Sequence, residues 1–310
     1  MGFTTRREFL GAAAMTPGVS AAAARPEKDA ISLAAWSLNR SFFTANKWEN
    51  LDLPRICREE FGITGIEFVN QFFENPTLNY LNRLKRAGLD YGVEFVLIMC
   101  DQEGDMAAAS RDERLSAARA HRKWIDAGYY LGCHAIRCNL GGPRAYAGLE
   151  AEIVERAADS FRDLLAYART AGMTVLIENH GGASSDPRVL VALMKEVNDP
   201  NFGTLPDFGN VNPGARHASV LRELLPFAKG ISVKAFWSAD GSHPRWDLEQ
   251  LLRICVEAGY HGFWGIESGL SRTGDRDKDA RLGSEEIWED EKRAVRLTRE
   301  VIERIVWKKG

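Results

Sequence analysis

The residues best suited to chemistry follow a short apolar segment near the middle of the chain. Residues 174–177 are β-branched or apolar, and Glu178, Asn179, His180 and two glycines come directly after them. A short apolar run bounded by turn residues is typical of a buried strand. Because side chains alternate along a strand, we expect Glu178 and His180 on one face and Asn179 on the other. A buried carboxylate is costly unless it is paired or binds a metal, so this strand end predicts a site for metal or acid–base chemistry.

The same order of apolar strand, polar break and amphipathic helix recurs after residue 30. We predict eight strands, at residues 31–38, 64–69, 93–99, 135–139, 174–178, 203–207, 231–235 and 263–267. Helical periodicity lies between them, for example at 111–131, 149–170 and 248–258, and we expect Gly88, Gly172 and Gly259 to end three helices. This pattern predicts a single (β/α)8 TIM barrel over residues 29–310. A doubly wound sheet is disfavoured because no glycine-rich dinucleotide motif follows the first strand.

In a TIM barrel the carboxyl ends of the strands meet at one mouth, so polar residues at those ends can form one site. Three carboxylates hold comparable places on the fifth, sixth and eighth predicted strands, namely Glu178, Asp207 and Glu267. Three acids this close repel one another, and a divalent cation is the usual remedy. The alternative is a structural network in which Arg137 and Lys234 pair with the acids. Three acids on one barrel end favour the metal site.

Other residues near strand ends are candidate substrate contacts. Glu67 ends the second predicted strand, and Arg137 and Asn139 share a face on the fourth. Arg137 could bind a phosphate or carboxylate of the substrate, or it could form a salt bridge to one of the acids. Sugar sites use aromatic faces, although barrel loops also bury aromatic side chains for packing. We predict Trp36 and Trp237 as walls of the substrate site.

Together these motifs resemble the sugar phosphate isomerase and epimerase superfamily, which has a xylose isomerase-like TIM barrel. The resemblance is carried by IENHGG at 177–182, DFGN at 207–210, Lys234 and GIE at 265–267, and it extends over residues 31–305. It is closest to a bacterial subgroup that is often exported. The resemblance implies one divalent metal ion held by Glu178, Asp207 and Glu267.

The chain departs from the family on the seventh strand, where Ser232 replaces a metal-binding histidine. His180 could supply the missing nitrogen, although we interpret it as a substrate contact. The site could instead be all oxygen, which favours Mn²⁺ or Mg²⁺ over Zn²⁺. In the third alternative Lys234 replaces the charge of the metal. Asn210 stands where many members bind substrate through a histidine, and its amide could hydrogen-bond a hydroxyl.

The resemblance implies an isomerase or epimerase that transfers a proton next to a carbonyl of a sugar or keto-sugar through an enediolate. Glu178 and Glu267 would remove and return the proton, with Lys234 beside them. The same groups could serve a lyase or dehydratase acting on a 3-keto sugar or an inosose. A non-catalytic sugar-binding barrel that has lost the metal is the further alternative.

Composition and charge limit the partners. A formal net charge of -3 and only six histidines argue against nucleic acid and against the DNA-repair endonucleases of this superfamily, which need three zinc ions. No apolar run approaches the ~20 residues that span a bilayer. The five cysteines have irregular spacing without a Cys-x-x-Cys motif, so we interpret most of them as small buried residues. We expect a small-molecule sugar as partner, and a homo-oligomer stays open.

The N-terminus has a different character. Arg6 and Arg7 are followed by Phe9 and Leu10 and then by an alanine-rich stretch that extends to Ala24. Paired arginines before a weakly hydrophobic segment that ends in small residues are typical of a twin-arginine signal. We therefore predict a signal peptide within residues 1–28 and export to the periplasm.

Overall fold

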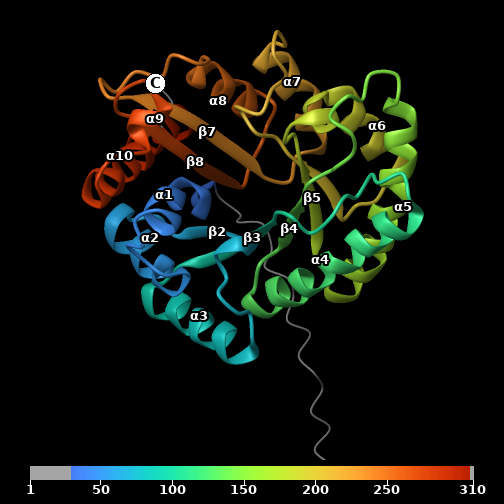
Figure 1. Cartoon of the computed structure of the whole chain (residues 1–310), viewed down its shortest axis with the longest axis horizontal. Coiled ribbons are helices and arrows are strands. Elements are labelled where there is room, and N and C mark those ends of the chain that lie inside the picture. The colour runs from blue at the N-terminus through green and yellow to red at the C-terminus, as the bar shows by residue number, and fades with distance from the viewer. Residues whose placement is uncertain (1–28, 308–310) are drawn as a thin grey trace, which may run out of the picture.

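The computed structural model describes residues 29–307 and contains an eight-stranded sheet in which all paired strands are parallel (Figure 1). The predicted signal peptide lies outside the described residues. The strands run in the order β6-β5-β4-β3-β2-β1-β8-β7. They are β1 (Ala30–Ala34), β2 (Gly65–Val69), β3 (Glu94–Cys100), β4 (Ala135–Cys138), β5 (Thr174–Glu178), β6 (Phe202–Leu205), β7 (Ile231–Ser238) and β8 (Phe263–Ser271). This arrangement confirms the predicted TIM barrel.

Helices lie around the outside of the strands (Figure 1). They are α1 (Asn39–Phe43), α2 (Leu53–Phe61), α3 (Leu78–Tyr91), α4 (Arg111–Leu131), α5 (Glu150–Ala168), α6 (Pro187–Val197), α7 (His217–Leu224), α8 (Leu248–Glu257), α9 (Arg276–Asp279) and α10 (Ser284–Ile302). The bounds of α4 match the prediction, because Ser110 caps its first turn and Gly132 follows its last in the left-handed region. Within residues 29–307, no helix has the length and apolar character that a membrane span requires.

Several predicted bounds differ from the structure, and two of these differences affect how the elements pack. Gly88 does not end a helix but lies inside α3, which continues to Gly92 with φ 62°. A Cβ at Gly88 would lie 2.5 Å from the ring of Phe95, so the glycine is needed for close packing of α3 on β3. The first strand is shorter than predicted, because residues 35–38 form a 3-10 helix. Within it, the Ser37 hydroxyl donates to the Ile266 carbonyl of β8 and accepts the Ser268 amide.

The barrel closes between β6 and β7 through isolated bridges rather than a continuous ladder. One bridge pairs Asp207 with Ser232, where the Phe208 amide donates to the Ser232 carbonyl and the Ser232 amide donates to the Pro206 carbonyl. The seam of the barrel therefore passes through two residues of the predicted site. All five cysteines are buried and unpaired, which agrees with their interpretation as small core residues.

Candidate active site

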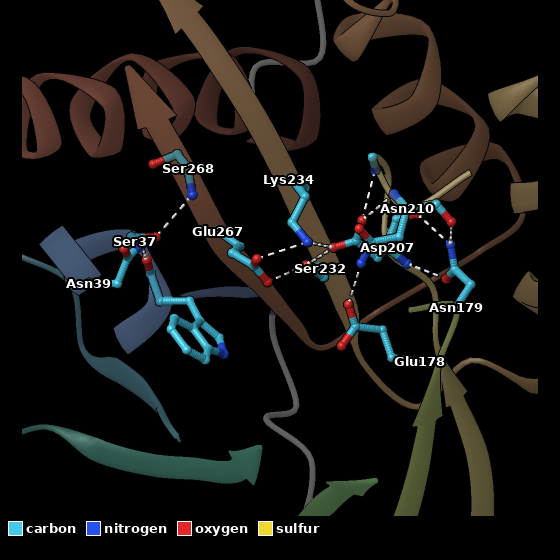
Figure 2. A network of polar contacts seen from close by, with 12 residues as sticks. Ser37, Asn39, Glu178, Asn179, Asp207, Asn210, Ser232, Lys234, Glu267 and Ser268 are labelled. Carbon is cyan, nitrogen blue, oxygen red and sulfur yellow. Dashed lines mark hydrogen bonds and ion pairs between the residues drawn. The ribbon is translucent and has the colours of Figure 1, made fainter. Parts of the chain in front are cut away.

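The structure brings the three predicted metal-binding acids together at the carboxyl ends of the strands. Glu178 ends β5, Asp207 follows β6, and Glu267 lies in β8. One carboxylate oxygen from each lies within 4.8 Å of the other two. Figure 2 shows the three side chains converging, with Ser232 and Lys234 of β7 among them. The spacing of these oxygens suits a single bound cation, whose first-shell bonds to oxygen measure about 2.0–2.6 Å.

Asp207 is the most firmly held of the three acids. Its Oδ1 accepts the backbone amides of Gly209 and Asn210 at 2.8 and 2.7 Å. Its Oδ2 accepts the Ser232 hydroxyl at 2.7 Å and lies 3.1 Å from Lys234 Nζ. Asn179, on the opposite face of β5 from Glu178, receives the Asp207 amide and donates to two carbonyls of the same loop (Figure 2). The loop after β6 is therefore fixed to the end of β5.

Lys234 joins the acids of β6 and β8. Its Nζ lies 2.8 Å from Glu267 Oε1 as well as 3.1 Å from Asp207 Oδ2. Burial by itself would lower the pKa of Lys234, but the charges of Asp207, Glu267 and Glu178 outweigh it, and the pKa is raised. The amine is thus a fixed cation. Ser232 stands beside it, with its hydroxyl 3.5 Å from Glu267 Oε2.

Glu178 has one carboxylate oxygen without a directed donor. Its Oε1 accepts the Asn210 side-chain amide at 2.8 Å. Its Oε2 lies 2.9 Å from Arg137 Nε, but the N–H does not point at the oxygen, so the contact is an ion pair and not an aligned hydrogen bond. Burial raises the pKa of Glu178 and of Glu267, and repulsion from Asp207 adds to both. A buried oxygen that lacks a donor, next to two more carboxylates, fits a divalent cation.

Arg137 is sealed between two acids. Its side chain is 1% exposed, and its guanidinium bridges Glu178 and Asp101, with Nη1 2.6 Å from Asp101 Oδ1. Asn139 completes the cluster, accepting from Arg137 and donating to Asp101 at 2.7 Å. Of the two predictions for Arg137, the structure shows the salt bridge, and the capture of a substrate anion stays a prediction. The same contacts commit the Asn139 amide to the cluster.

Sequence reasoning missed Asp101. Burial would raise its pKa, but the charge and hydrogen bonds of Arg137 outweigh it, so the pKa is lowered and the group stays ionised. Its Oδ2 accepts the indole N–H of Trp36 at 3.1 Å, which holds that half-buried ring beside the Asp101 cluster. Asp101 directly follows the apolar strand β3, as Asp207 follows β6 with one residue between, so reading every strand end in the same way would have found it.

His180 is not part of the carboxylate group. Its backbone amide donates to the Ser184 hydroxyl, and part of the residue reaches solvent. Partial burial of the ring and the nearby cations Arg137 and Lys234 lower the pKa of His180, so the imidazole is neutral near pH 7. A neutral ring at the mouth can both donate and accept a hydrogen bond. The role of His180 as a substrate contact stays a prediction.

Two predicted substrate contacts point elsewhere. Glu67 is buried inside the barrel, where it accepts the Ser32 hydroxyl at 2.5 Å, and a Cβ at Gly265 would lie 2.3 Å from its Oε1. Gly265 precedes Glu267 by two residues, so the Glu67 carboxyl lies one step deeper than the acids of the mouth. Trp237 faces outward, because its indole N–H donates to Thr298 of α10 at 2.8 Å. Both predictions are therefore corrected.

A second aromatic residue covers the site from the loop between β7 and α8. A Cβ at Gly209 would lie 2.6 Å from the Trp246 ring and 2.9 Å from Lys234 Cδ. The Trp246 indole therefore packs close to the stem of Lys234, and it stacks on His217 with ring centroids 5.1 Å apart. No periodic pattern marks this loop, so the position of Trp246 at the mouth could not be predicted from the sequence.

Comparison with solved structures supports the fold. D-psicose 3-epimerase of Clostridium cellulolyticum H10, solved with D-tagatose, is 14% identical with a TM-score of 0.66, over 90% of this chain and 99% of that one. The apo form of the 3-keto-D-glucoside 4-epimerase of E. coli is 16% identical with a TM-score of 0.62, over 88% and 99%. The IOLI protein with a bound zinc atom gives 14% identity and a TM-score of 0.69, over 90% and 99%.

At these identities the similarity establishes the fold and leaves the reaction open. No curated protein sequence matches the chain. A family model described as xylose isomerase-like TIM barrel matches residues 58–296, which is most of the chain. Because this match covers most of its length, the chain belongs to the xylose isomerase-like TIM barrel family.

Proposed function

We propose that the protein is a sugar isomerase or epimerase that uses one divalent metal ion to transfer a proton next to the carbonyl of a keto-sugar. The observation that carries this proposal is the group of three carboxylates within 4.8 Å, in which Glu178 Oε2 has no directed donor. The bound ion would polarise the carbonyl and the adjacent hydroxyl of the substrate. Two similar folds, described as a D-psicose 3-epimerase and a 3-keto-D-glucoside 4-epimerase, support a sugar as substrate.

The residues that would hold the ion are Glu178, Asp207 and Glu267, with the Ser232 hydroxyl beside the last two. This donor set is entirely oxygen, which favours Mn²⁺ or Mg²⁺ over Zn²⁺. Among similar folds, one from Mycobacterium smegmatis was solved with magnesium and IOLI with zinc. His180 is outside the group of acids that meet within ligand distance. The proposal therefore needs no nitrogen ligand.

Proton transfer falls to Glu178 and Glu267, which reach the site from β5 and β8. The Asn210 amide and the Arg137 ion pair hold Glu178, and Lys234 holds Glu267. Burial raises the pKa of both glutamates above the usual carboxyl value, which suits groups that accept and return a proton. One glutamate would take the proton from the carbon next to the carbonyl, and the other would return one to the enediolate of the substrate. Loss of a β-leaving group at the same stage would give a lyase.

Solvent deuterium exchange tests this assignment. The protein is incubated with Mn²⁺ and a panel of keto-sugars in D₂O, and incorporation is followed by NMR. We expect deuterium at the carbon next to the carbonyl, and Glu178→Gln should slow it by at least about 100-fold, as for loss of a positioned base. Glu59→Gln, a change at an exposed residue of α2, serves as the matched control. Absence of exchange into every keto-sugar tested would contradict the proposal.

A non-catalytic sugar-binding barrel is the second candidate, and one observation favours it. Lys234 Nζ contacts two of the three acids, so an internal cation already neutralises part of the site. Metal content after purification without chelator, followed by titration with Mn²⁺, separates the two candidates. A protein that neither retains a divalent ion nor binds Mn²⁺ would favour this second function.

We also propose export through the twin-arginine pathway, supported by the pair Arg6 and Arg7 ahead of an alanine-rich stretch. Replacement of both arginines by lysine should retain the protein in the cytoplasm, which fractionation of cells that express the full chain measures. Unchanged distribution of the double variant would contradict this route.

A further inference from the structure

We propose that the loop between β7 and α8 binds the anionic end, a carboxylate or a phosphate, of the substrate. The subsite consists of Arg245 lying over Phe236, next to Trp246. The inference rests on the proposed function for the orientation of the substrate, whose carbonyl is taken to lie at the three acids. The presence of an anion-binding group at this place rests on the contacts of Arg245 alone.

The position of Phe236 on β7 places the subsite further toward the carboxyl end of this strand than the acids. It follows Lys234 by two residues on β7, and it pairs in register with Gly269, which follows Glu267 by two residues on β8. Because side chains alternate, Phe236 faces the same side of the sheet as Lys234, one step nearer the solvent. Two residues of a strand rise about 7 Å. A Cβ at Gly269 would lie 3.5 Å from the Phe236 ring, so that ring lies beside Gly269 of β8 at ordinary contact distance.

Arg245 lies over this ring. Its guanidinium carbon is 4.3 Å from the Phe236 centroid, within the range of a cation–π contact. In residues 29–307 it has no ion-pair or hydrogen-bond partner. The acids of its own loop are engaged locally, because Asp240 accepts the Ser242 amide and Asp247 caps α8 by accepting the Gln250 amide. A guanidinium that lies over a ring and has no ion-pair partner has N–H groups available for a planar or tetrahedral anion.

The other two cations of the mouth cannot take this role. Lys234 contacts both Asp207 and Glu267, and Arg137 contacts both Asp101 and Glu178. Four carboxylates thus surround two cations, so this cluster has an excess of negative charge and would repel the anionic group of a substrate. A charged substrate avoids this repulsion if its carbonyl lies at the acids and its anionic group lies near Arg245. Phe236 is two residues beyond Lys234 on β7, a rise of about 7 Å, so the Arg245 subsite lies outward from the acids along this strand.

Three 2-ketohexoses that differ only at C6 test the subsite, namely D-fructose, D-fructose 6-phosphate and D-fructuronate. Their dissociation constants are measured by titration calorimetry with the Mn²⁺-loaded full chain. We expect at least one charged sugar to bind about twofold to fivefold more tightly than D-fructose, as for one partly exposed charge contact. The preference between carboxylate and phosphate identifies the source of the anion. Added NaCl should weaken the charged ligand more than the neutral one.

Two variants assign the effect to the proposed residues. Arg245→Gln should remove the preference for the charged sugar and leave D-fructose binding unchanged, and Phe236→Leu should reduce the preference by loosening the guanidinium. Arg253→Gln, an exposed change on α8, is the matched control. Equal affinity for charged and neutral sugars, no detectable binding of either charged sugar, or an undiminished preference in Arg245→Gln would each overturn the subsite. Deuterium exchange into D-fructose without any charge preference would overturn the subsite and leave the proposed function standing.

Discussion

Glu67 and Glu267 hold equivalent places on the two strands that flank β1, because Ile66 and Ile266 both pair with Leu33. Their surroundings differ. Glu267 faces Lys234 at the mouth, whereas Glu67 extends over Ser32 and Gly265 in the interior with one oxygen lacking a partner. Burial raises the pKa of Glu67 to about 7, and Glu267 contributes to the same direction. Glu267 is thus an ion-paired acid, whereas Glu67, at the same register position on the other strand, has a pKa near 7.

This difference predicts a pH-dependent gain in stability for Glu67→Gln. The folded pKa of Glu67 is above its unfolded value, so its contribution to stability is complete below about pH 4.5 and is lost as the pH rises through about 7. We expect the variant to match the native chain near pH 4.5 and to exceed its free energy of unfolding by about 1–3 kcal/mol at pH 8. Urea unfolding at both pH values measures this. A difference that does not change with pH would contradict a titrating Glu67, and Glu59→Gln is the control.

Removal of the internal cation should strengthen metal binding. In Lys234→Met, Asp207 and Glu267 lose the amine that lies 3.1 and 2.8 Å from them, so their charge is uncompensated until a cation enters. We expect Mn²⁺ to bind at least about tenfold more tightly and the metal-free variant to unfold at a lower temperature, with Mn²⁺ restoring it. Calorimetric titration and thermal unfolding measure the two effects. Weaker Mn²⁺ binding would instead show that the Lys234 amine helps to position the acids.

Arg137 should be essential for stability. Arg137→Met leaves Asp101 and Glu178 buried without their shared cation, which costs about 3–5 kcal/mol of unfolding free energy. Because Arg137 opposes the raised pKa of Glu178, its loss should also move the acid limb of the exchange rate to higher pH. Urea unfolding gives the first quantity and the pH profile of deuterium exchange the second. An unchanged profile in a folded variant would exclude Glu178 as the titrating group.

Ser232→His should change which metal the site prefers. The Ser232 hydroxyl already lies 2.7 Å from Asp207 Oδ2 and 3.5 Å from Glu267 Oε2, so a ring at this position would reach the acids. An imidazole nitrogen is a better ligand for Zn²⁺ than a hydroxyl. We expect Zn²⁺ affinity to rise relative to Mg²⁺ by about tenfold or more, measured by competition between the two ions, and Ser232→Ala should show no such rise.

Long periodic elements were predictable from the sequence, and the ends of elements were less so. Residues 111–131 form a helix as predicted because the apolar pattern, cap and terminal glycine agree. The first strand was predicted too long. After Ala34 the chain forms a 3-10 helix, in which the Ser37 hydroxyl contacts β8, a strand distant in the sequence. Trp237 was misplaced because β7 continues to Ser238, and alternation over the full strand turns its side chain outward.

The acids of the site were predictable for a related reason. Glu178, Asp207 and Glu267 each end an apolar run, and barrel topology brings such ends together. The partners of these acids were harder to infer, because hydrogen-bond geometry depends on loop conformation. The side-chain amide of Asn210 donates to Glu178, a contact that the sequence did not predict, and its hydrogen bond to a substrate hydroxyl stays a prediction. Arg245 and Trp246 lie in a loop without periodicity, where only the folded chain shows what they contact.

The bridge between Asp207 and Ser232 closes the barrel at its weakest ladder. Local opening of a barrel starts where few hydrogen bonds join neighbouring strands, and amide hydrogen exchange reports such openings. A ligand held by Asp207 and Glu267 would bind across this seam and would therefore slow exchange at the amides of Phe208 and Ser232. Ligand binding would then lower the hydrogen-exchange rate of these two backbone amides. Their exchange would report binding even when the substrate is not known.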